Sequence, residues 1–384
     1  MQKVELLAPA GDIEKMKIAF LYGADAVYLG GRFGLRASAS VEDDDLKQAV
    51  DYAHSIGKRV YVTVNIFVRN KDFPSIKEHV KHLEKIGVDA VIVSDLGVMK
   101  LVREDTNLDI HVSTQANVLN KYTAEEYVRL GAKRIILGRE CSLTEIKEIA
   151  QHVRGKCEIE VFIHGAMCVS YSGRCLLSNA MQGRDANRGE CSHPCRWKYS
   201  LMEEKRPGEY FPIEEDAHGT YVMNSKDLCL IDHLDKLKDA GVTAFKIEGR
   251  NKSEYYVAGV VNAYHRELGQ EELQKIAHRP YTTGFLLGEN DHLYEKHNNP
   301  VSGYDVVAKC LGGDRVELRN AFNDGDELEI LSYGENHNKV FVVTGIREVG
   351  GVSVQRANKA DEVYTIQCPY KLNAGEFLRK RREK

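Results

Sequence analysis

The clearest pattern along the chain is a repeated unit in which a helix-like stretch ends at a glycine and a short apolar run follows at once. The copies read GADAVYLGG from Gly23, GVDAVIVSD from Gly87, GAKRIILGR from Gly131 and GVTAFKIEG from Gly241, with GKRVYVTVN from Gly57 as a looser relative. Glycine just after the last helical residue is typical of a helix C-terminus, and a short apolar run is typical of a buried strand. Each copy therefore predicts a helix joined directly to a strand.

Eight apolar runs of this kind predict eight strands of a parallel sheet, because parallel neighbours need a crossover connection and a helix is the usual one. The predicted strands are Val4–Leu7, Ala26–Leu29, Val60–Val64, Ala90–Val93, Ile110–Ser113, Arg134–Leu137, Glu158–Phe162 and Ala244–Glu248. Eight alternating units favour an α/β fold of the closed, TIM-like (β/α)8 barrel type. A doubly wound open sheet is the alternative, but no G-x-G-x-x-G follows the first strand.

Two departures from the repeat divide the chain into domains. A cysteine-rich insertion at residues 163–240 separates the seventh and eighth strands and begins at the end of the barrel where active sites are built. Residues 1–290 are predicted to form the barrel with this insertion. From residue 300 to 384, short β-rich runs broken by Gly, Asn and Asp predict a small antiparallel β-barrel domain. Its last residues, 377–384, are rich in Arg and Lys and are interpreted as a solvated basic tail.

Composition narrows the function classes. The formal net charge of −4 means that an RNA partner would have to meet a local basic patch. No apolar run approaches a membrane span or a signal peptide, so we expect a cytoplasmic protein without membrane attachment. Nine cysteines exceed what packing needs, and a reducing compartment disfavours disulfides. Metal or redox chemistry is therefore expected of the crowded cysteines, whereas four others are expected to be buried hydrophobes: Cys141, Cys157, Cys310 and Cys368.

The crowded cysteines have irregular spacing. Six residues separate Cys168 from Cys175, fifteen more lie before Cys191, three separate it from Cys195, and Cys229 follows further on. Such thiolates suit zinc or an iron–sulfur cluster, and the lack of two short C-x-x-C knuckles favours the cluster. The alternative is that these cysteines hold no metal. Nearby cations would lower the thiol pKa values and offset cluster charge: Arg174, Arg188, Arg196 and Lys198.

A longer motif surrounds the first two cysteines. It reads Glu160-x-Phe162-x₂-Gly165-Ala166-Met167-Cys168-x₄-Gly173-x-Cys175-x-Leu177-Ser178 and resembles the signature of peptidase family U32, the collagenase-like family. The resemblance extends through Leu7–Gly11, Asn224–Leu228, Lys246–Arg250 and Tyr281–Phe285. It implies a barrel with a small C-terminal β domain and a 4Fe–4S cluster held by Cys168, Cys175 and Cys191. For the fourth ligand the resemblance divides between Cys229 and Cys195, and we favour Cys229.

The family resemblance implies two enzyme classes. A peptidase would need a nucleophile, yet the chain has no H-E-x-x-H and no G-x-S-x-G. His164 with Cys168 is the available base–nucleophile pair, but a cysteine that binds a cluster cannot act as a nucleophile. Members with a C-terminal β domain look most like those that hydroxylate the wobble uridine of tRNA without oxygen, with prephenate as hydroxyl donor. A non-catalytic redox or RNA-binding scaffold is a third hypothesis.

Polar residues at the predicted strand ends are the candidates for the site, because barrel enzymes place reacting groups there. As catalytic residues we expect His164, Lys246, Glu248 and Arg250, and as substrate-binding residues Asn65, Gln115, Asn117, Arg174 and Arg196. An Arg or Lys among them would clamp a carboxylate such as that of prephenate. The alternative for Lys246 and Glu248 is an ion pair that closes the barrel end. Expected partners are tRNA and a second protein of the same family, while the oligomeric state stays open.

Overall fold

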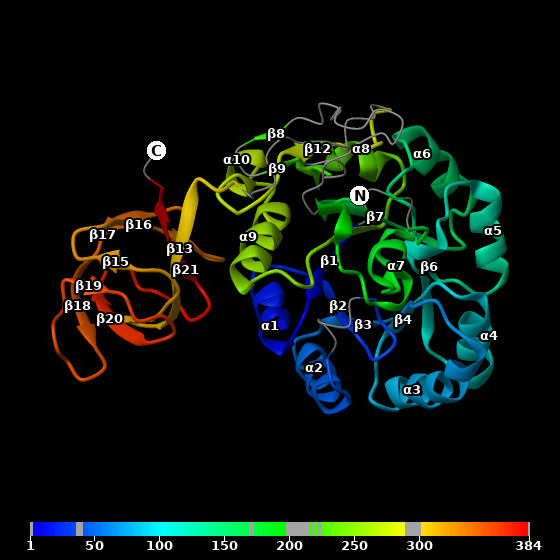
Figure 1. Ribbon diagram of the computed structural model, residues 1–384, viewed down its shortest axis with the longest axis horizontal. Helices are drawn as coiled ribbons and strands as arrows, with labels where there is room; N and C mark the ends of the chain where they lie inside the picture. Colours follow the sequence, from blue (N-terminus) through cyan, green and yellow to red (C-terminus); the bar gives the residue numbers. More distant parts are fainter. Residues whose placement is uncertain are drawn as a thin grey trace, which may run out of the picture. The chain divides into compact units, whose positions relative to one another are not determined.

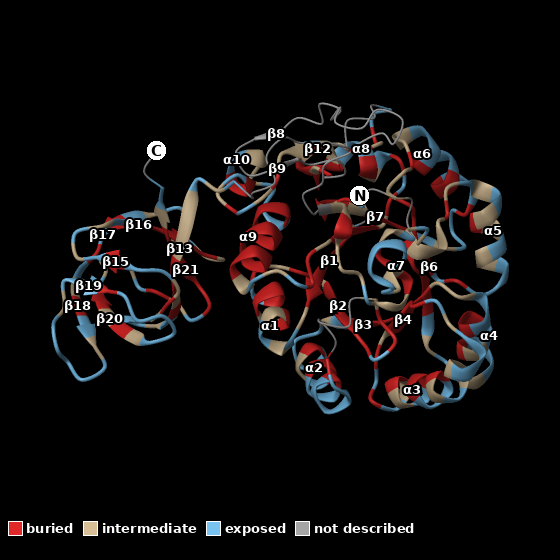
Figure 2. Ribbon diagram, viewed as in Figure 1, coloured by how far each residue is buried: buried red, intermediate tan, exposed pale blue. Residues whose placement is uncertain are grey.

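The computed structural model describes residues 3–35, 41–168, 170, 173–196, 215–216, 219–220, 225–288 and 301–382. It divides into two compact units (Figure 1), one formed by residues 1–16, 24–252 and 279–300 and the other by residues 17–23, 253–278 and 301–384. The sequence predicted a division near residue 290. In the structure, residues 253–278 also belong to the unit that contains the C-terminal sheet. Each unit has its own buried core (Figure 2).

The first unit is a closed barrel of eight parallel strands, which confirms the predicted fold. Strand order runs through β1, β2, β3, β4, β5, β6, β7 and β11, and β11 pairs with both β7 and β1 to close the ring. The strands are β1 Glu5–Ala10, β2 Ala26–Gly30, β3 Arg59–Val64, β4 Ala90–Val93, β5 Asp109–Val112, β6 Arg134–Ile136, β7 Glu158–Ala166 and β11 Ala244–Ile247. Each observed strand begins within two residues of the start of its predicted counterpart.

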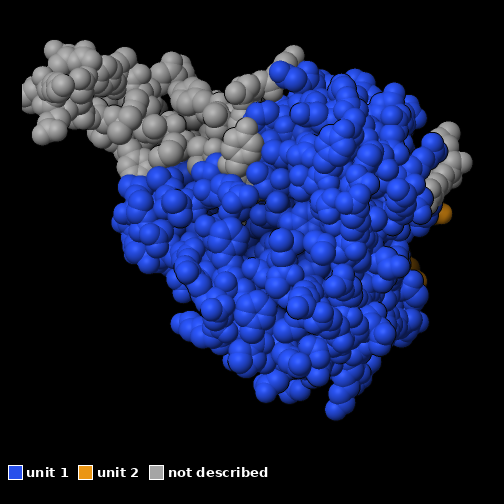
Figure 3. All heavy atoms as spheres, turned by 90° about the vertical axis from the view of Figure 1, so that its right-hand side faces the viewer, with its two compact units in different colours: residues 1–16, 24–252, 279–300 blue, residues 17–23, 253–278, 301–384 orange. Residues whose placement is uncertain are grey.

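Helices connect most of these strands. They are α1 Ile13–Leu21, α2 Asp43–Ser55, α3 Phe73–Lys85, α4 Leu96–Asp105, α5 Lys121–Arg129, α6 Leu143–His152 and α8 Leu234–Asp239. Figure 3 views the first unit from the side on which α4 and α5 lie. Polar N-caps begin several of them: the Asp95 carboxylate accepts hydrogen bonds from two backbone amides of α4, and Ser142 and Glu145 form a capping box on α6. The repeat detected in the sequence is therefore the α-to-β joint of the barrel.

The cysteine-rich insertion extends strand β7 beyond the barrel. It contains α7 Leu177–Gln182 and returns through β10 Asp227–Cys229, which pairs antiparallel with the end of β7 and parallel with β12 Tyr281–Thr282. Two short strands, β8 Glu215–Asp216 and β9 Gly219–Thr220, lie between. Because β10 pairs with residues 164–166, β7 is longer than the predicted Glu158–Phe162. The insertion is thus joined to the C-terminal end of the barrel through a shared strand.

Among its described residues, the second unit contains the C-terminal part of α1, two further helices and an antiparallel sheet. The helices are α9 Glu254–His265 and α10 Gln270–Leu273, and the sheet order is β17-β16-β21-β13-β14-β20-β18. Its strands are β13 Tyr304–Gly312, β14 Arg315–Leu318, β16 Glu327–Leu331, β17 Val340–Val342, β18 Thr344–Glu348, β20 Val363–Gln367 and β21 Phe377–Arg381, beside a pair formed by β15 Phe322–Asn323 and β19 Arg356–Ala357.

The interpretation of residues 377–384 as a solvated tail was wrong. Strand β21 lies inside the sheet between β13 and β16, and the Arg379 side chain is fully buried. Its guanidinium donates to the carboxylates of Glu272, at 2.7 Å, and Glu329, at 2.8 Å. Lys380 pairs with Asp326 at 2.8 Å. These acidic partners come from distant parts of the sequence, which is why a run of cations looked like a tail.

Candidate functional site at the barrel mouth

A small cavity lies at the C-terminal end of the barrel strands, where the insertion covers them. Its volume is about 180 Å³. Its lining combines predicted site residues from the strand ends with cysteines of the insertion: Asn65, Gln115, Lys246, Glu248, Arg250, Cys168, Cys175, Cys191 and Cys195. Strand ends and insertion therefore meet at one place, as the sequence predicted.

One wall of the cavity is a cluster of neutral polar groups. The Asn65 amide nitrogen donates to the Ser113 hydroxyl at 3.1 Å and to the Gln115 carbonyl oxygen at 3.2 Å, and the Ser113 hydroxyl also donates to Gln115. The Asn65 carbonyl oxygen accepts from the backbone amide of Leu35 at 3.0 Å. These bonds fix the orientation of the amides, so the wall presents donors and acceptors in set positions.

The opposite wall carries a lysine inside the barrel. Lys246 is only 3% exposed, and its ammonium donates to the Glu160 carboxylate at 2.9 Å. Glu160 also accepts from the guanidinium of Arg134 at 3.1 Å, and Arg134 reaches Glu5 at 2.6 Å. The sequence analysis offered an ion pair as the alternative role of Lys246. Lys246 does form an ion pair, but its partner is Glu160 on β7 and not Glu248.

Burial sets the charge properties of this interior network. Burial lowers the pKa of Lys246, and the neighbouring Glu160 carboxylate opposes that shift without cancelling it. For Arg134, burial disfavours the charged form, but Glu160 and Glu5 more than compensate and raise its pKa. The two cations thus differ: Arg134 keeps its proton, whereas Lys246 releases its proton more readily than an exposed lysine.

Two guanidinium groups complete the cationic side of the cavity. Arg250 is buried, donates to the Thr63 hydroxyl at 3.3 Å and bonds the backbone carbonyl of Leu35. Arg139 donates to the backbone carbonyl of Ala166 at 2.6 Å and lies 3.2 Å from the Cys168 sulfur. Among the described lining residues, Lys and Arg outnumber the single carboxylate, Glu248. The cavity is therefore suited to an anion.

Four cysteines of the insertion line the cavity. Cys168 is exposed, and Cys175, Cys191 and Cys195 are partly buried. In the described part of the chain, no three thiol, imidazole or carboxylate groups lie as close together as a bound metal would require. One cavity nevertheless gathers four cysteines, which is the number of thiolates that an iron–sulfur cluster takes as ligands.

Close backbone contacts hold the insertion against the barrel. Gly165 and Gly173 both have positive φ, and a side chain on Gly173 would lie 2.4 Å from the backbone oxygen of Gln115. A side chain on Gly165 would lie 2.7 Å from the backbone oxygen of Glu248. Only glycine fits at such positions. The two motif glycines therefore bring the cysteines beside the polar strand ends.

Several predicted residues do not join the cavity. A register shift between Lys246 and Ile247 pairs Ile247 with His164, and the His164 ring lies against Tyr281 instead of the cavity. Asn117 ends the short helix Thr114–Ala116 in a left-handed conformation. The residues outside the lining are His164, Asn117, Arg174, which is exposed, and Cys229, which is buried in β10. The side chains of Arg196 and Lys198 fall outside the described residues.

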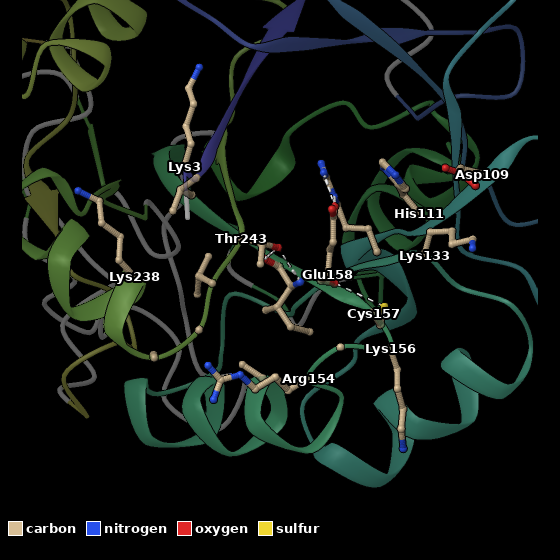
Figure 4. Close-up of a pocket in the computed structure, with 18 of the residues that line it drawn as sticks. Lys3, Asp109, His111, Lys133, Arg154, Lys156, Cys157, Glu158, Lys238 and Thr243 are labelled. Carbon is tan, nitrogen blue, oxygen red and sulfur yellow. Dashed lines mark hydrogen bonds and ion pairs between the residues drawn. The ribbon is translucent and has the colours of Figure 1, made fainter. Parts of the chain in front are cut away.

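A second and larger cavity, of about 790 Å³, lies at the opposite, N-terminal end of the barrel (Figure 4). Lys133, Arg154 and Lys156 are exposed at its rim, and in Figure 4 their side chains point in different directions. Arg134 and His111 are buried in its floor. This end was not predicted as a site, because its lining comes from the N-terminal parts of the strands and from the segments that precede them, whereas barrel enzymes place reacting groups at the other end.

The chain matches the sequence pattern described as peptidase family U32 over residues 11–296 and the C-terminal domain of that family over residues 302–379. The chain belongs to peptidase family U32. It is 38% identical to "tRNA hydroxylation protein P" of Escherichia coli (strain K12), over 96% of this chain and 94% of that protein. The family assignment agrees with the barrel and the separate C-terminal sheet.

Other U32 relatives have different names. The chain is 38% identical to "23S rRNA 5-hydroxycytidine C2501 synthase" of Escherichia coli (strain K12), over 94% of this chain and 55% of that protein. It is 30% identical to "Collagenase" of Porphyromonas gingivalis (strain ATCC BAA-308 / W83), over 97% of this chain and 93% of that protein. Both enzyme classes expected from the sequence are thus represented. No helix in the described residues is long and apolar enough to cross a membrane.

Sequence reasoning missed several lining residues, among them Arg139, Tyr28 and Phe162. Arg139 lies three residues beyond the end of β6, and Tyr28 and Phe162 lie inside strands. The Arg139 guanidinium lies 5.3 Å from the centre of the Phe162 ring, and the Lys246 ammonium lies 4.2 Å from the centre of the Tyr28 ring. The signal for Arg139 was available: it is a cation at the C-terminal end of a barrel strand. Tyr28 and Phe162 were not distinguishable from core aromatics.

Proposed function

We propose that this chain hydroxylates RNA, that its substrate is the wobble uridine of tRNA, and that the product is 5-hydroxyuridine. One observation carries the proposal. A single cavity at the barrel mouth unites four cysteines with an anion-binding set of cations, in a chain that resembles a tRNA hydroxylation protein along nearly its whole length. Hydroxylation needs a redox centre and a source of oxygen, and the two halves of this cavity suit those two needs.

The cysteines of the cavity would hold a 4Fe–4S cluster. Cys168, Cys175, Cys191 and Cys195 are its proposed ligands. Cys195 replaces Cys229, which we favoured from the sequence, because Cys229 is buried in β10 opposite His164 and does not line the cavity. The cluster would supply one-electron chemistry when bound. Arg139 beside the Cys168 sulfur would stabilise the thiolate and orient it.

The cationic half of the cavity would bind the hydroxyl donor. We propose prephenate for this role in an oxygen-independent reaction, because it is a dicarboxylate and guanidinium groups bind carboxylates bidentately. Arg250 and Arg139 would each hold a carboxylate, and the amides of Asn65 and Gln115 would orient the ligand. Burial of Lys246 and Arg250 strengthens such charge pairing, since little water screens them.

The peptidase alternative rests on the resemblance to the collagenase of Porphyromonas gingivalis. It needs a base beside Cys168, and the residue proposed for that role, His164, packs against Tyr281 outside the cavity lining. The geometry therefore favours hydroxylation. A peptidase would cleave denatured collagen without metal and lose that activity in the His164→Ala variant, whereas we expect no cleavage by either protein.

The deciding experiment is complementation. The chain is expressed in a host that lacks its own tRNA hydroxylation proteins, and tRNA nucleosides are measured by mass spectrometry. We expect 5-hydroxyuridine derivatives to appear with the wild type and to be absent with Cys195→Ala, while Cys229→Ala restores them. Absence with the wild type, after anaerobic purification has shown iron in the protein, would contradict the tRNA proposal. Iron and RNA binding without any modified nucleoside would instead support the scaffold hypothesis.

A further inference from the structure

Lys246 is placed unusually for a barrel lysine. Barrel interiors are filled chiefly by branched apolar side chains, yet this ammonium lies inside the ring of strands, 3% exposed, and lines the mouth cavity. Its contacts within the described residues come from two strands: the ammonium lies 2.9 Å from Glu160 of β7 and 4.2 Å from the centre of the Tyr28 ring of β2. A buried amine beside an open cavity is a group that a ligand can reach but bulk water reaches poorly.

The charges around Lys246 leave it only partly compensated. Glu160 is shared between Lys246 and Arg134, so one carboxylate serves two cations. Glu248, which follows β11 directly, is a second acid near the amine, while Arg134 of β6 is a cation that disfavours the charged form of Lys246. The Tyr28 hydroxyl donates to Glu248 at 3.1 Å. Transfer of the ammonium proton to Glu160 would leave a neutral amine, which is a nucleophile towards carbonyl carbon.

The two guanidinium groups of the same cavity identify the ligand class. Arg250 and Arg139 provide planar forks that bind a carboxylate. A ligand that offers a carboxylate to an arginine and an electrophilic centre to the lysine needs the two groups close together. The smallest such molecules are 2-oxo acids, in which the carbonyl carbon is bonded directly to the carboxylate, and the cavity of about 180 Å³ suits a compact acid.

We propose that Lys246 captures a 2-oxo acid as a covalent Schiff base, with Arg250 or Arg139 holding the adjacent carboxylate. The inference deepens the proposed function, since prephenate carries a 2-oxo acid side chain, but the capture itself needs neither RNA nor a cluster.

The reaction is balanced without any other reagent. The Lys246 ammonium transfers one proton to Glu160, and the amine attacks the carbonyl carbon to form a carbinolamine. The C–O bond then breaks, and the oxygen leaves as water with two protons, one of which returns from Glu160. The product is a protonated imine and one water molecule, so no electrons are gained or lost. The cationic imine replaces the ammonium opposite Glu160 and keeps the ion pair intact.

Borohydride trapping tests the proposal directly. The purified full chain is incubated with pyruvate, a 2-oxo acid, and sodium borohydride in the absence of RNA, and the adduct is located by peptide mass spectrometry. We expect a reduced pyruvyl adduct on Lys246 in the wild type. Lactate, which has the carboxylate but no carbonyl, should give no adduct and should slow trapping by pyruvate. Lys246→Arg should abolish the adduct, and Arg250→Lys should raise the pyruvate concentration needed.

A second pair of variants separates the lysine chemistry from its folding role. Glu160→Gln removes the carboxylate that favours the ammonium, so trapping should reach its half-maximal rate at lower pH. Glu158→Gln removes a different partner of Arg134, half exposed and 2.5 Å from its guanidinium, and should leave the pH profile unchanged. Adducts spread evenly over surface lysines, or none on Lys246, would overturn the inference. An adduct on Lys246 in a protein that restores no 5-hydroxyuridine would overturn only the RNA proposal.

Discussion

At the N-terminal end of the barrel, the cations Lys133, Arg154 and Lys156 stand exposed around a cavity of about 790 Å³, whereas at the C-terminal mouth Lys246 and Arg250 are buried around one of about 180 Å³. Exposed cations are screened by water and contribute little binding energy individually. Buried cations act in a medium of low dielectric constant, so a ligand that pairs with them gains more. Cavity size is therefore a poor guide to function here, and the burial of charge is a better one.

The interior network joins these two ends. Arg134 contacts Glu5 and Glu158 towards the N-terminal end, and through Glu160 it reaches Lys246 at the mouth. Buried ion pairs of this kind rarely add stability relative to apolar packing, because desolvation offsets the attraction. Stability alone therefore does not explain this network, whereas the proposed reaction of Lys246 would give it a use at the mouth.

We expect the largest loss of activity from substitution of a cysteine at the barrel mouth, because the proposed cluster ligands lie there and not at the N-terminal end. Cys168→Ser should lose the iron of the anaerobically purified protein and all RNA hydroxylation, because one of four proposed ligands is removed. Cys157→Ser is the matched control at the N-terminal end, where burial raises the pKa of the Cys157 thiol to about 12 and disfavours metal binding. Iron content and nucleoside mass spectrometry measure both. If Cys168→Ser retained its full iron content, the proposal that a cluster lies in this cavity would be contradicted.

The next effect concerns stability. Glu160→Gln leaves Arg134 and Lys246 buried without their shared carboxylate, so we expect the free energy of unfolding to fall by about 3–5 kcal/mol. Glu158→Gln, whose carboxylate is half exposed, should cost no more than about 1 kcal/mol. Urea unfolding of both variants gives the comparison. Equal losses would mean that the interior and the N-terminal end hold Arg134 equally strongly.

A smaller effect is expected from pH at the N-terminal end. Burial lowers the pKa of His111 well below 6.5, so the unfolded chain takes up a proton before the folded chain does. The free energy of unfolding should therefore fall as pH decreases below 6.5, by up to about 1.4 kcal/mol per pH unit from this residue. His111→Gln should remove that share, so its unfolding free energy should approach that of the wild type as pH falls. If the unfolding free energies of the wild type and of His111→Gln changed with pH in parallel, His111 would not be the source of the pH dependence.

We expect the smallest effect from substitution of the exposed lysines at the N-terminal end of the barrel. Lys133→Gln and Lys156→Gln change exposed charges at the N-terminal rim, so stability should change by less than about 0.5 kcal/mol and RNA hydroxylation should be unchanged. Nucleoside mass spectrometry after complementation provides the measurement. A marked loss of hydroxylation in a stable double variant would show that the larger cavity also serves the reaction.

The fold was predictable because its information is local. A glycine after a helix and an apolar run behind it mark most of the α-to-β joints, and the strand-end rule places Asn65, Gln115, Lys246 and Arg250 at the mouth. The failures involve pairing between distant residues. His164 leaves the cavity because of a register shift between β7 and β11. Cys195 and Cys229 were indistinguishable by spacing, because the pairing of β10 with β7, which puts Cys229 opposite His164 and outside the cavity lining, joins residues that are distant in the sequence.

The position of β21 has a consequence for biosynthesis. Residues 377–381 follow all other strands of the second unit in the sequence, yet they pair with both β13 and β16 in the middle of that unit's sheet. The eight barrel strands are complete by residue 247, so the barrel can form during translation. The sheet of the second unit cannot be completed until β21 has been synthesised. A prematurely terminated product would carry two open strand edges, which invite aggregation.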